Sequence, residues 1–291
     1  MAKFSGAFYK FKGSIGNITF RRVNGTTVVS EKVEPKATPS RSYAQMRRRM
    51  QWANIVNLWG CFEGNLHPSF EGRKASVSDF NEFVSANLGI VPVYLTKGEA
   101  SADGSVAAGY QVTRGSLPEI AHSTGVGDVP VTDIALGGLA IGPSTTLKQF
   151  SDAVCQNNSN YQNGDQISCF HCTQTANAAS GVPYVRIIAE EVTLDRSDNE
   201  TLLYDVCSAL CFSSAGGVLG AQSPVPGAIC WIHSRKTASG TKVSTQRLQA
   251  TNPVLPRYQS AAQLEAAIES YGGTTRPDFL TPNASDVVEP E

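Results

Sequence analysis

The sequence predicts an α+β fold: an N-terminal β-hairpin plus two helices, then a β-rich, sandwich-like domain with a few helices. Strand-like runs bounded by Gly, Pro and Ser recur beyond residue 90, whereas few segments carry apolar residues at helical steps of three and four. The 291 residues can bury one large core or two modest ones. The charged fraction of 17% lies below the roughly 25% of soluble domains, so part of the surface is expected to form contacts.

A β-hairpin is predicted near the N-terminus. Residues 17–23 and 26–33 have the composition of strands, and the dipeptide Asn24-Gly25 lies between them. Both residues of this dipeptide tolerate the positive φ angles that a two-residue hairpin turn requires. The two strands are therefore expected to pair antiparallel.

Two helices are expected after the hairpin. Thr38-Pro39 has the form of an N-cap followed by proline at the first helical position, and Gly60 is a candidate stop. The apolar residues of this first helix recur on one face, which we expect to pack against the hairpin: Tyr43, Met46, Met50, Ala53 and Val56. A shorter helix is predicted over residues 78–87, with Gly89 as its C-cap.

The remaining chain reads as strands interrupted by two amphipathic helices. The helices are predicted over residues 146–157 and 260–271, and residues 237–241 have the composition of a hairpin loop. The predicted strands cover residues 91–95, 108–112, 134–141, 166–174, 184–194, 228–234 and 242–248. We therefore divide the chain into a basic hairpin-helix assembly module (1–89), a β-rich α+β body (90–273) and an extended C-terminal arm (274–291).

Positive charge is concentrated in the predicted module. Residues 1–89 contain 13 Lys and Arg against 6 Asp and Glu, and the remainder contains 11 against 19. The candidate interface residues of this basic unit are Arg21, Arg22, Arg41, Arg47, Arg48 and Arg49. Such a division fits either identical subunits that meet basic to acidic or a surface that contacts DNA. Successive helical residues point about 100° apart, so the three consecutive arginines cannot all face one DNA groove, which favours a solvated face or a protein interface rich in ion pairs.

No motif predicts an enzyme, a metal site or a cofactor. Cys169-Phe170-His171-Cys172 comes nearest to a zinc motif, but it lies in a predicted strand, where residues three apart point to opposite faces. Asp195, Asp198 and Glu200 lack the spacing of a calcium-binding loop, which indicates a solvated surface. Phosphate-binding loops and the G-x-S-x-G nucleophile motif do not occur in the sequence.

The sequence also lacks membrane and export signals. No apolar run approaches the roughly 18 residues of a membrane helix, and the N-terminal residues lack the apolar core of a signal peptide. The seven cysteines are odd in number and irregularly spaced, which is typical of reduced, buried thiols. We therefore expect synthesis and folding in the cytoplasm, without a membrane partner.

Several short motifs of the N-terminal block occur in a recognisable order. Gly13-Ser14-Ile15-Gly16 precedes Phe20-Arg21-Arg22-Val23-Asn24-Gly25, a Gln45-Met46-Arg47-Arg48 helix follows, and Phe80-Asn81-Glu82-Phe83 closes the block. Over residues 6–89 this order resembles structural proteins of tailed phages and prophages of gut Bacteroidetes, including crAss-like phages. The chain departs from their Asn-Pro-Arg-Thr order, because it has Ala37-Thr38-Pro39-Ser40. A more distant likeness to the same group lies around Asn163-Gly164-Asp165-Gln166 and Ser234-Arg235-Lys236.

The resemblance implies a structural role in a virion and supplies no catalytic residues. We therefore expect a non-enzymatic virion protein, made in the host cytoplasm, that associates with itself and with neighbouring virion proteins in a ring, a head-tail connection or a capsid-auxiliary position. The alternative is a DNA-binding architectural protein that uses the basic N-terminal unit. The two functions differ in what the arginines of the basic N-terminal unit contact: an acidic protein surface in the first and DNA in the second.

Overall fold

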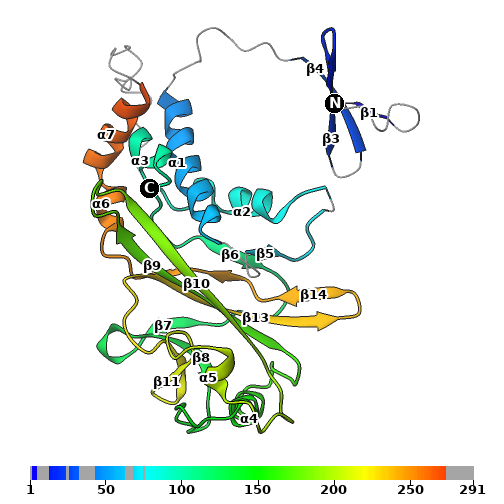
Figure 1. The fold of residues 1–291 in the computed structure, drawn as a ribbon, viewed down its shortest axis with the longest axis vertical. Helices are drawn as coiled ribbons and strands as arrows, with labels where there is room; N and C mark the ends of the chain where they lie inside the picture. Colours follow the sequence, from blue (N-terminus) through cyan, green and yellow to red (C-terminus); the bar gives the residue numbers. More distant parts are fainter. Residues whose placement is uncertain are drawn as a thin grey trace.

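The computed structural model describes residues 2–4, 13–23, 26–32, 43–62, 68–74 and 76–272. It confirms the α+β prediction, because the described residues form several open sheets and also helices, which are fewer than the strands (Figure 1). The predicted arm 274–291 lies outside the described residues. Among those that are described, no helix combines the length and the apolar character of a membrane span.

A long antiparallel sheet forms the centre of the body. Its strands lie in the order β10 (Pro183–Thr193), β9 (Gln166–Ala176), β13 (Gly227–Thr237) and β14 (Gly240–Val243), and the short β16 (Gln249–Ala250) also pairs with β13. β13 and β14 form the hairpin predicted around residues 237–241, with Thr237 opposite Gly240. The first seven residues of β9 and the first eight of β13 are buried, so this sheet is covered on both faces.

The two faces of the central sheet belong to two different hydrophobic cores. Phe170 and Cys230 lie in the first core, whereas Cys169 and Trp231 lie in the second. Alternate residues of a strand point to opposite faces, which explains why neighbours in the sequence are separated in this way. The apolar run at the start of β13 follows from this two-sided burial.

The first core is covered by two helices and a small sheet. Helices α1 (Tyr43–Gly60) and α2 (Asp79–Asn87) lie on this side, with strands β15 (Gln246–Arg247), β6 (Gln111–Arg114) and β5 (Ser69–Phe70). Ile55 of α1 and Phe83 of α2 are buried in the same cluster as Phe170 of the central sheet. The boundary that the sequence suggested at residue 89 therefore falls inside a shared core.

The second core lies under helix α4 and another small sheet. Helix α4 (Leu147–Asn157) buries Phe150 against Phe212, with ring centroids 6.1 Å apart. The sheet has the order β11 (Ser213–Ala215), β12 (Val218–Gly220), β8 (Pro130–Ala135) and β7 (His122–Thr124). The short helix α5 (Leu203–Val206) and the 3₁₀ helix Val126–Asp128 complete this region.

A third, smaller cluster corrects one prediction about α1. Met46 and Met50 are buried, but they pack with Tyr94, Ala267 and Ile268 and not against the N-terminal hairpin. Ala267 and Ile268 come from helix α7 (Ala261–Gly272), which follows α6 (Leu255–Gln259); α3 (Lys97–Ser101) lies beside them. Of the predicted apolar face, Met46 and Met50 are buried and Ala53 and Val56 are half-buried, whereas the buried Ile55 and Leu58 were not assigned to it. The partner of the two methionines comes from the other end of the chain.

The predicted hairpin belongs to a separate four-stranded sheet. The strand order is β1 (Ala2–Phe4), β4 (Thr26–Glu31), β3 (Ile18–Val23) and β2 (Gly13–Ile15). β3 and β4 pair antiparallel with Val23 opposite Thr26, as the turn chemistry predicted. In Figure 1 this sheet lies apart from the rest of the described chain.

Four predicted strands are not formed over their whole length. Of residues 108–112 only 111 and 112 belong to a strand, β6, and of residues 134–141 only 134 and 135 do, in β8. Residues 91–95 are not a strand, because the backbone of Tyr94 bonds to the helical region: its N–H donates to Tyr258 O at 2.9 Å, and its carbonyl accepts from Gln263 Nε2 at 2.9 Å. Residues 242–248 are divided at Ser244. Before it the chain pairs with β13 as β14, and after it the chain pairs with β6 as β15. Ser244 links both sheets, since its Oγ accepts from His233 N and its carbonyl accepts from Thr113 Oγ1.

Candidate interaction surface on helix α1

Helix α1 carries three exposed arginines and an exposed tryptophan. Arg48, Arg49 and Trp52 point away from the buried residues of the helix, whereas Arg47 points about 100° from Arg48, toward another side. Met46, Met50, Ile55 and Leu58 are buried, whereas the side chains of the three consecutive arginines 47–49 are exposed. Residues three and four apart are neighbours on a helix, so Trp52 lies beside both Arg48 and Arg49. The Trp52 side chain is 47% exposed. We call Arg47, Arg48, Arg49 and Trp52 the α1 surface.

Two asparagines, the buried Asn54 and the half-buried Asn57, hold α1 in a fixed position on the body. Asn54 Nδ2 donates to Tyr110 Oη at 2.8 Å, and Asn54 Oδ1 accepts from Val106 N–H at 2.8 Å. One turn further on, Asn57 Nδ2 donates to the carbonyl oxygens of Ala100 at 3.0 Å and Gly104 at 2.8 Å. Since the helix is attached through its core face and these polar contacts, the α1 surface is carried on a rigid element.

The arginines of the α1 surface carry uncompensated charge. Among the residues that the structure describes, Arg47, Arg48 and Arg49 make no salt bridge, although six others are formed elsewhere in the body. Arg and Trp are the residue types that most often dominate binding energy at protein interfaces. The α1 surface therefore has the composition of a contact region.

The other predicted basic residues are not brought to this surface. Arg21 lies exposed on β3, opposite Val28 of β4, in the separate N-terminal sheet. Arg22 lies on the same strand, but its side chain is outside the described part, and so is the whole of Arg41. Sequence reasoning also missed Trp52, because an aromatic residue in a helix is expected in the core; its i+3 and i+4 spacing from two arginines was the available signal.

The cysteine motif does not converge on one site. Cys169 faces the second core and Cys172 the first, as the alternation of strand residues predicted. Burial raises the pKa of both thiols well above the ordinary value. Thiols of this kind are poor nucleophiles and poor metal ligands, because both roles require the thiolate.

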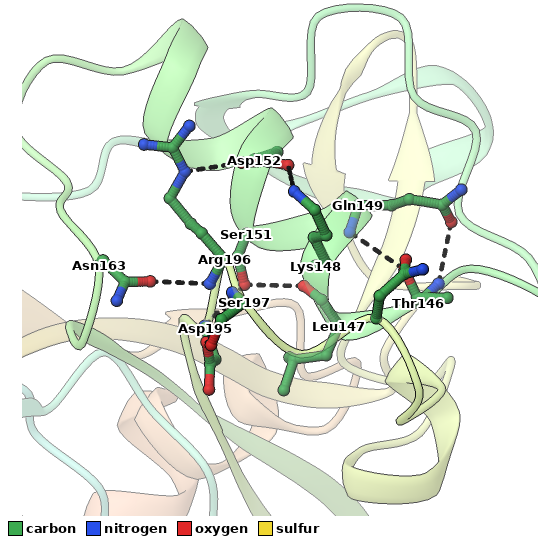
Figure 2. A network of polar contacts seen from close by, with 11 residues as sticks. Thr146, Leu147, Lys148, Gln149, Ser151, Asp152, Asn163, Asp195, Arg196 and Ser197 are labelled. Carbon is green, nitrogen blue, oxygen red and sulfur yellow. Dashed lines mark hydrogen bonds and ion pairs between the residues drawn. The ribbon is translucent and has the colours of Figure 1, made fainter.

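The acidic loop after β10 forms hydrogen bonds within its own backbone and with helix α4, and Figure 2 shows part of this network. Asp195 Oδ1 accepts from Ser197 N–H at 2.8 Å, and Asp198 Oδ1 accepts from Thr201 N–H at 2.9 Å. These hydrogen bonds lower the pKa of both carboxyls. The loop also caps α4, since Lys148 N–H donates to Asp198 O at 2.8 Å. This loop therefore holds the start of α4 in place.

Figure 2 also shows how the same loop is attached to the side of α4. Asp152 accepts from Lys148 Nζ and from Arg196 Nε, both at 2.6 Å. Arg196 N–H donates to Asn163 Oδ1 at 2.8 Å, which ties the loop to the turn before β9. The side chains of this network are partly solvated, so they order the loop without creating an enclosed site.

A buried ionic cluster was not anticipated from the sequence. His233 Nε2 lies 2.8 Å from Asp165 Oδ2, and both side chains are 0% exposed. Arg235 binds the same carboxylate through Nε and Nη2, each at 2.7 Å, and the Tyr161 ring stacks on His233 with centroids 4.3 Å apart. The spacing of His233 and Arg235 on one strand face was the only local signal, because Asp165 lies 68 residues away from His233.

This cluster holds strand β13 against the turn before β9. Burial lowers the pKa of His233, so the ring is neutral at pH 7 and donates its Nε2–H to Asp165. Nδ1 of His233 is buried and has no hydrogen-bond partner. A base in this position has neither a nucleophile nor solvent at its free nitrogen, so the arrangement fixes β13 to the turn before β9.

Comparisons with protein-family models, with curated proteins and with solved structures found no match for this chain.

Proposed function

We propose that this protein is a non-enzymatic structural component of a tailed-phage virion that associates with copies of itself and with neighbouring virion proteins. The observation that carries the proposal is the α1 surface, a rigidly attached group of exposed arginines beside an exposed tryptophan. The resemblance of residues 6–89 to phage structural proteins supports the same role. No catalytic residue, metal or cofactor enters this proposal, and its localisation is the virion after synthesis in the host cytoplasm.

The charge distribution supports a protein partner for the α1 surface. The residues after 89 contain 19 Asp and Glu against 11 Lys and Arg, so a second copy offers an acidic counterpart. Contacts between a basic and an acidic patch accelerate encounter and exclude wrong registers. Head-to-tail contacts between unlike patches of identical subunits generate rings or extended arrays.

DNA contact is the second candidate function, because the same residue types support it. Arginines bind phosphates, and aromatic rings stack on bases of single-stranded nucleic acid. Successive helical residues diverge by about 100°, so only some of the three arginines can meet any one surface, whether it belongs to a duplex or to a protein. A single experiment can separate the two candidates.

Changing Arg47, Arg48 and Arg49 together to Glu is expected to leave the fold intact and to abolish assembly. Exposed substitutions cost within about 0.5 kcal/mol each. Like charges that now oppose an acidic partner cost several kcal/mol, which corresponds to at least a roughly 100-fold loss of affinity. Thermal unfolding measures the first effect, and analytical ultracentrifugation of the purified protein measures the second.

A matched control is offered by three exposed basic residues near the β13–β14 hairpin, Lys236, Lys242 and Arg247. Changing these to Glu alters the net charge by the same amount at another place, and assembly should persist. If the α1 variant assembles normally but no longer binds DNA, the architectural DNA-binding function replaces the structural one.

A further inference from the structure

Strand β10 forms one edge of the central sheet and is as long as the strand it pairs with. It runs over Pro183–Thr193 antiparallel to β9, and no strand of the described chain pairs with its other side. Figure 1 shows it crossing the length of the body. An open edge of this kind is a template for another strand unless something covers it.

Hydrogen bonds at the start of β10 show which residues face the open edge. Ser105 lies there, because its N–H donates to Pro183 O at 2.8 Å and its Oγ accepts from Val185 N–H at 3.0 Å. Backbone groups alternate in direction along an antiparallel strand. The amides of Ile187, Ala189 and Glu191 therefore also point outward, and within the described chain no hydrogen bond is made by these N–H groups.

Two opposite charges lie on one face of this open stretch without a counter-charge on the neighbouring strand. Arg186 is exposed and faces Thr173 on β9, while Glu190 faces Cys169. Four residues of strand separate them by about 13 Å, so they cannot pair with each other. Glu190 Oε2 accepts from Ser208 N–H at 3.0 Å, and among the described residues Arg186 has no ion-pair partner.

We propose that a second copy of this chain adds its own β10 to this edge, antiparallel and with Ile188 opposite Ile188 of the other copy. In this register Arg186 of each copy lies opposite Glu190 of the other, so two ion pairs form and every charge has one partner. The outward N–H groups of Ile187 and Ala189 then donate to carbonyl oxygens of the partner strand, and the outward carbonyl oxygens accept in return. A two-fold contact requires one self-complementary surface, and residues 186–190 have this property.

The neighbouring two-fold registers lack this complementarity. The N–H and C=O groups at the open edge of β10 belong to odd-numbered residues, so odd-numbered residues of one copy must lie opposite odd-numbered residues of the other. The two-fold axis can therefore pass only through a residue and not between two residues. With the axis at Ile187, Arg186 lies opposite Ile188, and with the axis at Ala189 it lies opposite Val192. Only the axis at Ile188 therefore compensates the charges.

This inference specifies one surface for the self-association that the proposed function requires, and it is tested by exchanging charges. Arg186→Glu gives an edge with two acidic residues, and Glu190→Arg gives an edge with two basic residues. Each variant alone is expected to dimerise at least about tenfold more weakly than the unchanged protein, because both cross-strand pairs become repulsive. An equimolar mixture of the two is expected to form heterodimers, since every pair is then attractive. Sedimentation velocity of the full chain measures all four samples.

A cysteine placed on the proposed axis tests the register. Residues directly opposite in a non-hydrogen-bonded antiparallel pair have Cα atoms about 4.5 Å apart, within the range of a disulfide. Ile188→Cys is therefore expected to cross-link into dimers on mild oxidation, whereas Tyr184→Cys on the same face is not, because residue 184 lies far from its own copy. The unchanged protein, with its seven native cysteines, is the control for background oxidation.

The outcomes separate this inference from the proposed function. If dimers form but persist in both single variants, β10 is not the contact, while self-association through another surface stands. If the unchanged protein and the mixture both stay monomeric at the highest soluble concentration, the charges serve only to protect the edge and this inference is wrong. The proposed function is then judged by the α1 variants in assemblies with neighbouring proteins.

Discussion

Replacing Asp165 with Ala is expected to lower the free energy of unfolding by about 3–5 kcal/mol, because it leaves the buried ring N–H of His233 without an acceptor and the Arg235 guanidinium without its counter-charge. The carboxylate accepts hydrogen bonds from His233 Nε2, from Nε and Nη2 of Arg235 and from Gln162 N–H. Its side chain is 0% exposed, so water cannot replace it. Chemical denaturation monitored by far-ultraviolet circular dichroism measures the loss.

Asp152 provides a matched control for this substitution. It also accepts from two cations, Lys148 and Arg196, but its side chain is 24% exposed. Exposed ion pairs contribute at most about 1 kcal/mol, so Asp152→Ala should change stability much less than Asp165→Ala. Equal losses for the two variants would show that the burial of the Asp165 cluster contributes nothing.

The same cluster predicts a loss of stability in acid. Burial alone would raise the pKa of Asp165, but hydrogen bonds from Arg235, Gln162 and His233 outweigh it and hold this pKa below 3.8. Burial lowers the pKa of His233 below 6.5, although the bond to Asp165 opposes the shift. For both groups the unfolded chain binds protons first, so stability is complete above about pH 6.5 and falls as the pH is lowered. Denaturation midpoints across the neutral and acidic range measure this slope, and its part below pH 3.8, which comes from the Asp165 carboxyl, should be absent in Asp165→Ala.

Trp231→Ala is expected to lower the free energy of unfolding by about 3–5 kcal/mol, the usual cost of removing a large aromatic side chain from a core. Trp231 is 0% exposed, and it lies in the second core on the central strand β13. Its Nε1–H donates to Cys211 O at 2.8 Å, so the substitution also removes the partner of a buried carbonyl. Thermal and chemical unfolding measure the effect.

Trp52→Ala is the control with the same chemical change at an exposed position. Trp52 is 47% exposed, so we expect a loss of stability well below that of Trp231→Ala, because less buried apolar surface is removed. Association should nevertheless weaken, because Trp52 belongs to the α1 surface and exposed tryptophans carry much of the binding energy at interfaces. A large destabilisation by Trp52→Ala without any effect on association would assign this residue to the fold.

The elements that the sequence predicted well are those stabilised by neighbouring residues. Thr146 and Gln149 form a reciprocal capping box at the start of α4, and Ser78 caps α2 by accepting from Asn81 N–H. The hairpin β3–β4 follows from its turn, and Gly89 adopts the positive φ of 91° that ends α2. Each of these signals lies within a few residues of the structure that it specifies.

The misassigned segments are those whose partners are distant in the sequence. Residues 91–95 have the composition of a strand, but Tyr94 bonds to residues from the region of α6 and α7. Residues 242–248 were expected to be one strand, yet Ser244 connects two sheets. In both cases the local preference was extended backbone, and the pairing partner decided whether a ladder formed.

The sequence by itself determined the α+β class, most helices, the separation of Cys169 from Cys172 and the exposure of the three arginines, because periodicity and capping are local properties. Only the tertiary structure decided that Met46 and Met50 pack against α7, that Asp165 meets His233 and Arg235, and that Trp52 is exposed. These features depend on residues that are brought together from distant parts of the chain. A local pattern shows which face of an element is apolar or charged, but the energy of packing the whole chain selects what covers it.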